Sequence, residues 1–446
     1  MSRFLRMGAG ATWPGELALR FNPDILSDFT AGQEVIVLVA GTNGKTTTSK
    51  MMREIMEGNG RKVIHNDSGA NLVNGLVSAY IKSSNLLGNT RSKYSVFEVD
   101  ENAFPNVISK VKNQKSKVQI KNQKLIIILL NLFRDQLDRY GEVDSIARKW
   151  KESLKQLKSD DLAILNADDP QIAAIGKELQ SNVLYFGVDD QKEFLKHNEH
   201  ATDSTFCPNC GYKLYYEGRY FSHIGIWKCV NCGLGRPEIT SVSASSPLPG
   251  LYNRYNTFAA YLATKNLGID EKDIKDILDK FQPAFGRQEE FDVDGKKMKM
   301  FLAKNPAGFN ANLKTIIDLK AKSILLVLND RIPDGHDISW IWDVDFETLQ
   351  PEVNITVSGD RAWDMGLRIK YADLNQNAKI KMPSKISDEI LQDKQNDNSK
   401  VKIYEELKQA ITKALDGLKS GETLYILPTY SAMLDVRKIL TGRKIL

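Results

Sequence analysis

A glycine-rich turn carries the residue types that bind a nucleoside triphosphate. The sequence GTNGKTTT at residues 41–48 follows an apolar run, Val35 to Val39, and precedes a helical pattern that begins at Lys50. A turn between a strand and a helix directs backbone N–H groups and the positive end of the helix dipole towards one point, which favours phosphate. In such a loop Lys45 reaches the β- and γ-phosphates and the Thr46 hydroxyl holds Mg²⁺. The sequence therefore predicts ATP binding.

This loop departs from the usual P-loop, which has a further glycine five residues before the Gly-Lys pair. That position is Val39 here, and the first glycine is Gly41. The alternative is an ordinary turn between strand and helix. We favour the phosphate site because the strand, the turn, the Gly-Lys-Thr and the helix occur together. The expected ATP-binding residues of the loop are Gly41, Thr42, Asn43, Gly44, Lys45, Thr46 and Thr47.

Carboxylates follow a second apolar run, YSVFEV at residues 94–99, which places Glu98, Asp100 and Glu101 at the end of a predicted strand. Mg²⁺ takes oxygen ligands, with one or two protein carboxylates per site. We expect Glu98 to bind Mg²⁺ together with Thr46 and to act in catalysis, with Glu101 as the second candidate. The alternative is that these are solvated carboxylates at a strand end.

Two cysteine pairs have the spacing of a zinc ribbon. Cys207 and Cys210 are separated by 18 residues from Cys229 and Cys232, and a glycine follows each pair. Four thiolates can close a tetrahedral Zn²⁺ site, which leaves no open position for chemistry. We therefore expect a structural zinc ribbon at about residues 203–236. Two disulfides are the alternative, although nothing in the sequence indicates an oxidising compartment.

The composition is that of an ordinary globular protein. Of 446 residues, 42% are hydrophobic and 26% charged, and the net charge of +5 gives no indication of nucleic acid binding. No apolar run is long enough to span a bilayer, and no signal peptide is recognisable at the N-terminus. We expect a cytoplasmic protein, which can still act on a lipid-linked substrate as a peripheral protein at the inner face of the membrane.

Strands that alternate with helices predict an α/β fold. Strand patterns at 35–39, 62–64, 94–99, 124–132 and 161–166 indicate a doubly wound parallel sheet, with ligands at the carboxyl ends of its strands. This ATP-binding domain is expected to span residues 1–288 and to end with a helix from Thr257 to Leu267. A smaller Rossmann-like α/β domain would follow at 289–446, with a hairpin at 291–303. The polar tract 384–400 is interpreted as a surface loop.

A series of motifs resembles the Mur ligase family. In order, they are GTNGKTT, FEVDE, NLFRDQLDRYG, LNADDP, GLYNRYN, GRQEE and AKNPAG, and they cover most of residues 35–330. The resemblance implies an enzyme that phosphorylates a carboxylate with ATP and lets an amine attack the acyl phosphate. It also implies that Asn253 and Asn256 contact the nucleotide, that Arg287 lies at the hinge near the adenosine, and that Asp168 belongs to a family motif.

The chain departs from that family pattern at several positions. It has too few residues before the P-loop for the domain that binds UDP-linked substrates. Gln136 and Lys304 stand where most of the family has a histidine. The lysine that is carbamylated in the family corresponds to either Lys149 or Lys151, and the sequence leaves that choice open.

The short N-terminus, the four cysteines and the segment LNDRIPDGHDISWIWD at 328–343 resemble one branch of the family. That branch forms the ligase-like subunit of lipid II isoglutaminyl synthase. The resemblance implies amidation of the α-carboxyl of D-glutamate in lipid II, with ammonia from a class I glutaminase partner of the GatD type. Asp337 would then assist the partner's Cys-His pair, with Asp334, Asp343 and Asp345 as other candidates.

The cysteine count supports an external source of ammonia, because a glutaminase needs a nucleophilic cysteine and both CxxC pairs are assigned to zinc. Two other hypotheses remain. The chain could be another ATP-dependent amino-acid ligase, similar to folylpolyglutamate synthase, or an inactive scaffold that binds nucleotide. The four cysteines and the DGHDISW segment argue against the first, and the intact Gly-Lys-Thr with Glu98 argues against the second.

Overall fold

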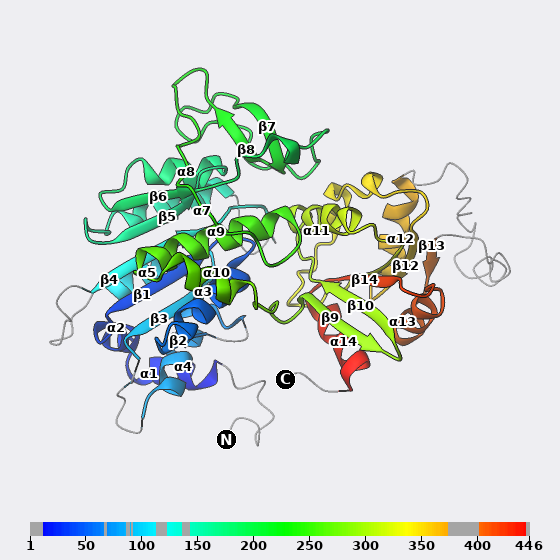
Figure 1. The fold of residues 1–446 in the computed structure, drawn as a ribbon, viewed down its shortest axis with the longest axis horizontal. Helices are drawn as coiled ribbons and strands as arrows, with labels where there is room; N and C mark the ends of the chain where they lie inside the picture. Colours follow the sequence, from blue (N-terminus) through cyan, green and yellow to red (C-terminus); the bar gives the residue numbers. More distant parts are fainter. Residues whose placement is uncertain are drawn as a thin grey trace. The chain divides into compact units, whose positions relative to one another are not determined.

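The computed structural model describes residues 12–66, 69–85, 90, 92–112, 123–135, 143–372 and 401–442. The chain forms two compact units, with a boundary between Gln282 and Pro283. The short segment Glu199–Ala201 belongs to the second unit. Each unit has its own six-stranded sheet (Figure 1). Gln136 and the polar tract 384–400 lie outside the described residues.

The sheet of the first unit is parallel throughout and has the strand order β2-β3-β1-β4-β5-β6. This confirms the parallel central sheet predicted from the alternation of strands and helices. The strands are β1 (Val35–Ala40), β2 (Val63–His65), β3 (Tyr94–Val99), β4 (Lys124–Leu129), β5 (Leu162–Asn166) and β6 (Asn182–Phe186).

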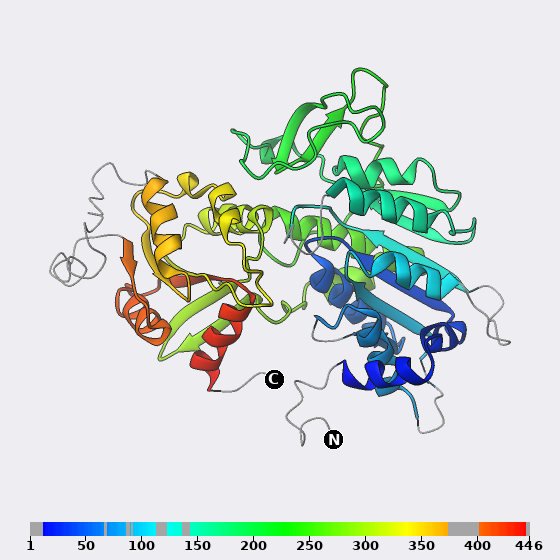
Figure 2. The ribbon, with the colours of Figure 1, turned by 180° about the vertical axis from the view of Figure 1, so that it is seen from behind.

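Helices cover both faces of this sheet. Helices α3, α9 and α10 pack on one face, which is towards the viewer in Figure 1, and α5 and α7 pack on the other, which Figure 2 shows. The helices of this unit are α1 (Trp13–Phe21), α2 (Ile25–Ala31), α3 (Lys45–Gly58), α4 (Val73–Ser83), α5 (Phe104–Lys112), α7 (Val143–Leu154), α8 (Pro170–Gly176), α9 (Leu251–Asn266) and α10 (Glu271–Leu278).

The central strands of this sheet are mostly apolar because helices cover both of its faces. Successive side chains of a strand point to opposite faces, so both sets of side chains are buried. Leu38, Ile127 and Trp150 share a core cluster on the α5–α7 face. The Trp150 ring lies 5.1 Å from the Phe104 ring. Its indole N–H donates to the Glu101 carbonyl at 2.8 Å. The core therefore reaches up to the acidic residues that follow β3.

The four cysteines flank an antiparallel hairpin of β7 (Tyr215–Phe221) and β8 (Ile224–Lys228). In the first unit this hairpin lies beyond the β6 side of the parallel sheet (Figure 1). A short 3₁₀ helix, η2 (Gln191–Glu193), precedes it.

The sheet of the second unit has the order β13-β12-β11-β14-β10-β9, in which only the edge strand β9 is antiparallel to its neighbour. The predicted hairpin around Asp294 and Gly295 is formed by β9 and β10, and both turn residues have positive φ. The strands are β9 (Arg287–Val293), β10 (Lys296–Phe301), β11 (Ser323–Val327), β12 (Asn354–Ser358), β13 (Val401–Ile403) and β14 (Thr423–Pro428).

Two helices cover each face of the second sheet. Ile324 and Leu326 of β11 pack in a cluster with α11 and α12, whereas Leu325 and Val327 pack with α13 and α14. The helical segments are α11 (Pro306–Asp318), η3 (Ser339–Asp343), η4 (Phe346–Thr348), α12 (Ala362–Tyr371), α13 (Leu407–Asp416) and α14 (Tyr430–Thr441). None of the helices in the described part of the chain combines the length and the apolar character that crossing a membrane requires.

Two predicted helix starts are wrong. The helix expected from Lys50 begins at Lys45, and the one expected from Thr257 begins at Leu251. Both starts follow a glycine with positive φ, Gly44 and Gly250. The sequence pattern did not mark these starts because the first turn of α3 is polar and that of α9 mixes apolar with polar residues, while tertiary contacts bury several of these side chains. As a result the side chains of both first turns lie on helices rather than on loops.

Candidate functional site

The register of three neighbouring strands brings the candidate residues together. Ala40, the last residue of β1, pairs with Val99 of β3 and with Leu129 of β4. The glycine-rich loop, the acidic segment after β3 and the loop after β4 therefore leave the sheet at the same edge. This is the edge at which parallel α/β sheets bind ligands.

The glycine-rich loop needs both of its glycines. Gly41 and Gly44 have φ values of +147° and +91°. A Cβ on Gly44 would stand 2.1 Å from the Asn256 Oδ1, and one on Gly41 would stand 2.8 Å from the Leu130 Cβ. The loop backbone thus packs directly against α9 and against the end of β4.

The loop after β4 fixes the conformation of the glycine-rich loop. The backbone N–H of Thr42 donates to the Asn131 carbonyl at 2.9 Å. The Asn131 side chain accepts from the Asn43 N–H at 2.8 Å and donates to the Asn43 carbonyl at 3.1 Å. The Phe133 N–H donates to the Thr42 hydroxyl at 3.0 Å. Asn131 is a site residue that the sequence motifs did not reveal, although a polar residue shortly after a buried strand indicated one.

Lys45 begins α3, and its ammonium group is buried. It donates to the Gly41 carbonyl at 2.5 Å and forms an ion pair with Glu101 at 3.0 Å, in which both side chains are less than a tenth exposed. A buried charge needs such a partner, because its desolvation costs several kcal/mol, about as much as the ion pair regains. Glu101 is therefore the partner of Lys45 in this structure.

Thr46 and Glu98 form the oxygen-rich part of the edge. The Thr46 hydroxyl donates to the Glu98 carboxylate at 2.5 Å. Asn66 holds the backbone on both sides of Glu98, accepting from its N–H at 3.0 Å and donating to its carbonyl at 2.8 Å. A hydroxyl and a carboxylate on a fixed backbone fit the oxygen ligands that Mg²⁺ requires. Asn66 was missed because its strand and the loop after it show no acidic motif.

The three acidic residues at the end of β3 and directly after it are not solvated. Glu98, Asp100 and Glu101 are 2%, 7% and 6% exposed. Asp100 accepts from the backbone N–H groups of Asn102 and Ala103 at 3.0 and 3.3 Å, and so stabilises the turn that leads into α5. The alternative of solvated strand-end carboxylates is therefore wrong for all three.

Asn253 and Asn256 lie on the first turns of α9, facing α3. The Asn256 amide donates to the Asn253 side chain at 3.1 Å, and its oxygen accepts from the Thr48 hydroxyl at 3.3 Å. The Asn253 amide donates to the Pro249 carbonyl at 2.7 Å. The structure thus brings Asn256 directly beside Gly44. Arg287 is the first residue of β9 and belongs to the second unit.

Asp168 is fully buried and joins three segments of the first unit. Its carboxylate accepts from the Arg236 guanidinium and from the Tyr255 hydroxyl, each at 2.6 Å, and from the Val188 N–H at 2.8 Å. Burial raises the pKa of Asp168, and the charge of Arg236 opposes that increase. These contacts give Asp168 a structural role that connects α9 with the cysteine-containing insertion, the segment at about residues 203–236 that holds the four cysteines and the β7–β8 hairpin.

The four cysteine sulfurs converge. All four lie within 4.8 Å of one another, and the Cys207–Cys232 and Cys210–Cys229 pairs are 3.6 and 3.5 Å apart. These distances far exceed a disulfide bond of about 2 Å. The backbone N–H of Gly211 and of Gly233 donates to the Cys207 and Cys229 carbonyls, and both glycines have positive φ. The two turns are thus equivalent, as expected for a four-thiolate site.

The four candidate aspartates of the second unit have different environments. Asp334 is buried and accepts from the Ser431 N–H at 2.8 Å, and Asp345 is buried and accepts from Asn310 and His200. Asp343 is half-buried in η3. Asp337 is exposed and accepts from the Ser339 N–H at 2.8 Å, which lowers its pKa.

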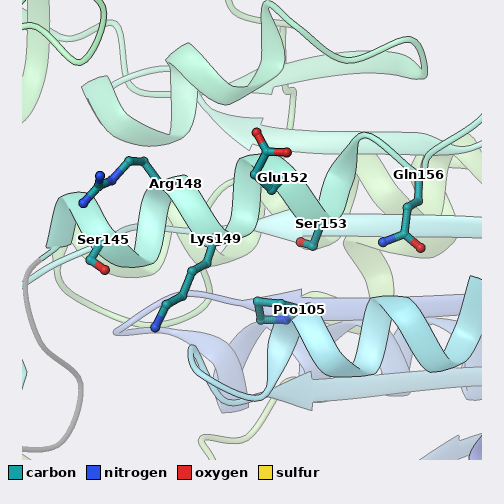
Figure 3. A pocket seen from close by; sticks show the side chains of 7 residues that line it. All are labelled: Pro105, Ser145, Arg148, Lys149, Glu152, Ser153 and Gln156. Atoms are coloured by element: carbon teal, nitrogen blue, oxygen red, sulfur yellow. The ribbon is translucent and has the colours of Figure 1, made fainter.

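The two lysines considered for carbamylation both lie on α7 and point to different surroundings. Lys149 lines a pocket between α7 and the start of α5 that Pro105 also lines, as Figure 3 shows. Lys151 forms an ion pair with Glu178 at 2.5 Å.

Comparisons with known proteins agree with this architecture. The Mur ligase middle domain family matches residues 39–264, and the MurT ligase C-terminal family matches residues 302–433. The MurT subunit of lipid II isoglutaminyl synthase (glutamine-hydrolyzing) from Staphylococcus aureus (strain COL) is 34% identical over 389 residues, which cover 82% of this chain and 84% of that protein.

The subunit of the same name from Streptococcus pneumoniae (strain ATCC BAA-255 / R6) is 29% identical over 464 residues, covering 99% of this chain and 94% of that protein. Among solved structures, a pseudomurein peptide ligase type C from Methanothermus fervidus superposes with a TM-score of 0.63 at 21% identity, covering 92% of this chain and 79% of that one. The likeness supports the α/β fold with a central sheet and a C-terminal domain.

The substitution Gly44→Ala tests the packing of the glycine-rich loop. The new Cβ would collide with Asn256 and would also need a positive φ, which costs about 1–2 kcal/mol for an L-residue. We expect the melting temperature to fall further than in Gly60→Ala. That control also has a positive φ, +77°, but nothing lies within 4 Å of its Cβ. Equal shifts in calorimetry would show that the contact with Asn256 contributes nothing.

Proposed function

The chain belongs to the Mur ligase family, within the branch of MurT subunits of lipid II isoglutaminyl synthase, and on this premise we propose its reaction. The enzyme is an ATP-dependent carbon–nitrogen ligase that amidates the α-carboxyl of D-glutamate in the lipid II stem peptide, giving D-isoglutamine for peptidoglycan synthesis. One carboxylate oxygen attacks the γ-phosphorus of ATP, forming an acyl phosphate and ADP. Ammonia then attacks the carbonyl carbon, phosphate leaves, and the amide loses a proton.

The observation that carries this proposal is the arrangement of the buried Lys45 and Glu98 with the half-buried Thr46 at the carboxyl edge of the first sheet. The Lys45 ammonium is held by Glu101 and two loop carbonyls, so it already points over the loop where phosphates would lie. An incoming phosphate would compete with Glu101 for this charge. Positioning and charge stabilisation are the main contributions that a protein makes to phosphoryl transfer.

The nucleotide site proper would be formed by Gly41 to Thr47, with Asn253 and Asn256 on α9. For Arg287 we keep the nucleotide-binding role that the family resemblance implies. Thr46 and Glu98 would hold Mg²⁺, which would neutralise charge on the transferred phosphate when bound. Asn66 holds the Glu98 backbone, and the Thr46 hydroxyl contacts the Glu98 carboxylate.

We assign the four cysteines to a structural zinc site. Zn²⁺ binds thiolates and takes four of them in closed structural sites. Burial raises the pKa of Cys207 to about 12, so this thiol in particular would be deprotonated only by a bound metal. The sulfur separations support one Zn²⁺ per chain and leave no coordination position for a substrate.

The ammonia would come from a class I glutaminase subunit of the GatD type, in a complex with lipid II at the inner membrane face. Asp337 is the aspartate best suited to assist that subunit's histidine. It is exposed and its pKa is lowered, so its carboxylate is charged and accessible, whereas Asp334 and Asp345 are buried. The match to MurT subunits favours this reaction over that of a folylpolyglutamate-synthase-like ligase.

Replacing Lys45 tests the nucleotide assignment. We expect Lys45→Ala to lower the rate of amide formation from lipid II, ATP and ammonium chloride about 10²–10³-fold, since a charge that stabilises the transition state is removed. Lys62→Ala removes an exposed lysine of the same unit and should retain full activity. A normal rate of amide formation in Lys45→Ala, measured by mass spectrometry of the product, would refute the assignment of the glycine-rich loop as the nucleotide site. Amino-acid ligation in place of amidation would support the alternative ligase.

Metal analysis of the purified chain tests the assignment of the four cysteines to a structural zinc site. We expect one zinc per chain, none in Cys207→Ser, and a lower melting temperature after chelation, because structural zinc sites contribute directly to folding. Alkylation of the denatured, unreduced chain should label all four cysteines. Recovery of two disulfides and no zinc would contradict the assignment.

The role of Asp337 is tested by separating the two sources of ammonia. In the complex with the glutaminase, Asp337→Asn should lower glutamine-dependent amidation by about 10⁴-fold, as for the aspartate of other triads. Amidation with ammonium chloride should be unchanged. Asp343→Asn serves as the matched control. If Asp343→Asn alone abolished the glutamine-dependent reaction, the assignment would move to that residue.

A further inference from the structure

The tip of the β7–β8 hairpin is buried in the first unit rather than exposed. Ser222 and His223, which connect the two strands, are both fully buried. Ser222 has φ +49°, a conformation that costs an L-residue energy and persists only where the surroundings require it. A hairpin that served only as a surface module would keep such a polar tip in water. This tip instead packs at the carboxyl ends of the strands of the parallel sheet, against Asp169 and the loop after β4.

His223 contacts Asp169, the N-cap of α8. The ring nitrogen Nε2 lies 3.4 Å from the Asp169 Oδ2, and the other ring nitrogen lies 3.3 Å from the Ser222 hydroxyl. Oδ1 of Asp169 accepts from two backbone N–H groups at the start of α8. Oδ2 also accepts from the Leu132 N–H at 2.9 Å. One buried carboxylate oxygen therefore joins the hairpin tip to the loop after β4.

That loop is the one that holds the glycine-rich loop. The Phe133 ring packs 4.9 Å from the His223 ring, and the Phe133 N–H donates to the Thr42 hydroxyl. The neighbouring Asn131 holds Asn43 through both ends of its side-chain amide. A continuous series of contacts thus runs from His223 through the loop after β4 to Thr42 and Asn43.

A second connection reaches the same site through α9. Arg236, which follows the second cysteine pair, forms an ion pair with Asp168 at 2.6 Å. Asp168 accepts from the Tyr255 hydroxyl on α9, and the next residue, Asn256, faces Gly44 and Thr48. The insertion therefore supports the glycine-rich loop from two sides.

We propose that the cysteine-containing insertion sets the affinity for nucleotide, with His223 and Arg236 as positioning residues for the glycine-rich loop. This inference rests on the proposed nucleotide site. Loss of the His223 contact leaves Asp169 with one donor fewer and the loop after β4 less constrained. Thr42 and Asn43 then sample conformations that cannot bind phosphate.

The test measures binding of a fluorescent ADP analogue with Mg²⁺ to the full chain. His223→Leu should raise the Kd about tenfold, the effect of one hydrogen bond to a buried charged group. His223→Gln retains an N–H that can reach Asp169 and should restore the Kd to within about twofold. Tyr215→Ser, an exposed position on the same hairpin, is the matched control and should bind as the wild type does.

Zinc content and melting temperature are measured on the same samples to separate positioning from folding. The proposal requires zinc to stay bound in His223→Leu while the Kd rises. It is overturned if His223→Leu binds nucleotide normally, or if His223→Gln loses affinity as severely as His223→Leu. If His223→Leu does not fold, Arg236→Lys replaces it, because this change keeps the charge and removes the planar guanidinium that contacts Asp168. A raised Kd for nucleotide then supports the proposal, and an unchanged Kd overturns it. Failure of the wild type itself to bind nucleotide would refute the proposed function instead.

Discussion

The parallel register of β1, β3 and β4 is the constraint on which the site depends. Because Ala40, Val99 and Leu129 are aligned across the sheet, the three segments that follow them emerge together. The first segment supplies Lys45 and Thr46, the second supplies Glu101, and the third supplies Asn131, while Glu98 is the last residue but one of β3 itself. A register shift of one residue would turn the side chains of a strand to its opposite face.

Burial of charge is the second feature that shapes this edge. The Lys45–Glu101 pair and the carboxylates of Glu98 and Asp100 lie at an almost solvent-free position, so each requires hydrogen-bonding partners. The surrounding chain provides them from the Thr46 hydroxyl, from the carbonyls of the glycine-rich loop, and from the backbone of the turn before α5. Such an arrangement is rigid before any ligand binds, which lowers the cost of ordering groups during phosphoryl transfer.

The cysteine-containing insertion extends the same principle. Asp168 and Asp169 are both fully buried, and each is satisfied in part by the insertion, through Arg236 and His223 respectively. Membership in the Mur ligase family accounts for the central sheet and the glycine-rich loop. The insertion adds a second layer of support to loops that the sheet alone would leave at its surface.

The sequence by itself determined the parallel α/β class, most strands, the glycine-rich loop and the two cysteine pairs, because each depends on local patterns of apolar residues, glycines or thiols. It also determined the family, through motifs such as GTNGKTT and GLYNRYN. Only the tertiary structure decided that α3 begins at Lys45, that α9 begins at Leu251, and that Glu101 pairs with Lys45. It also revealed the roles of Asn66, Asn131 and His223. These features depend on contacts between segments distant in the chain, and the free energy of burying a polar group is decided by its partners, which no local pattern specifies.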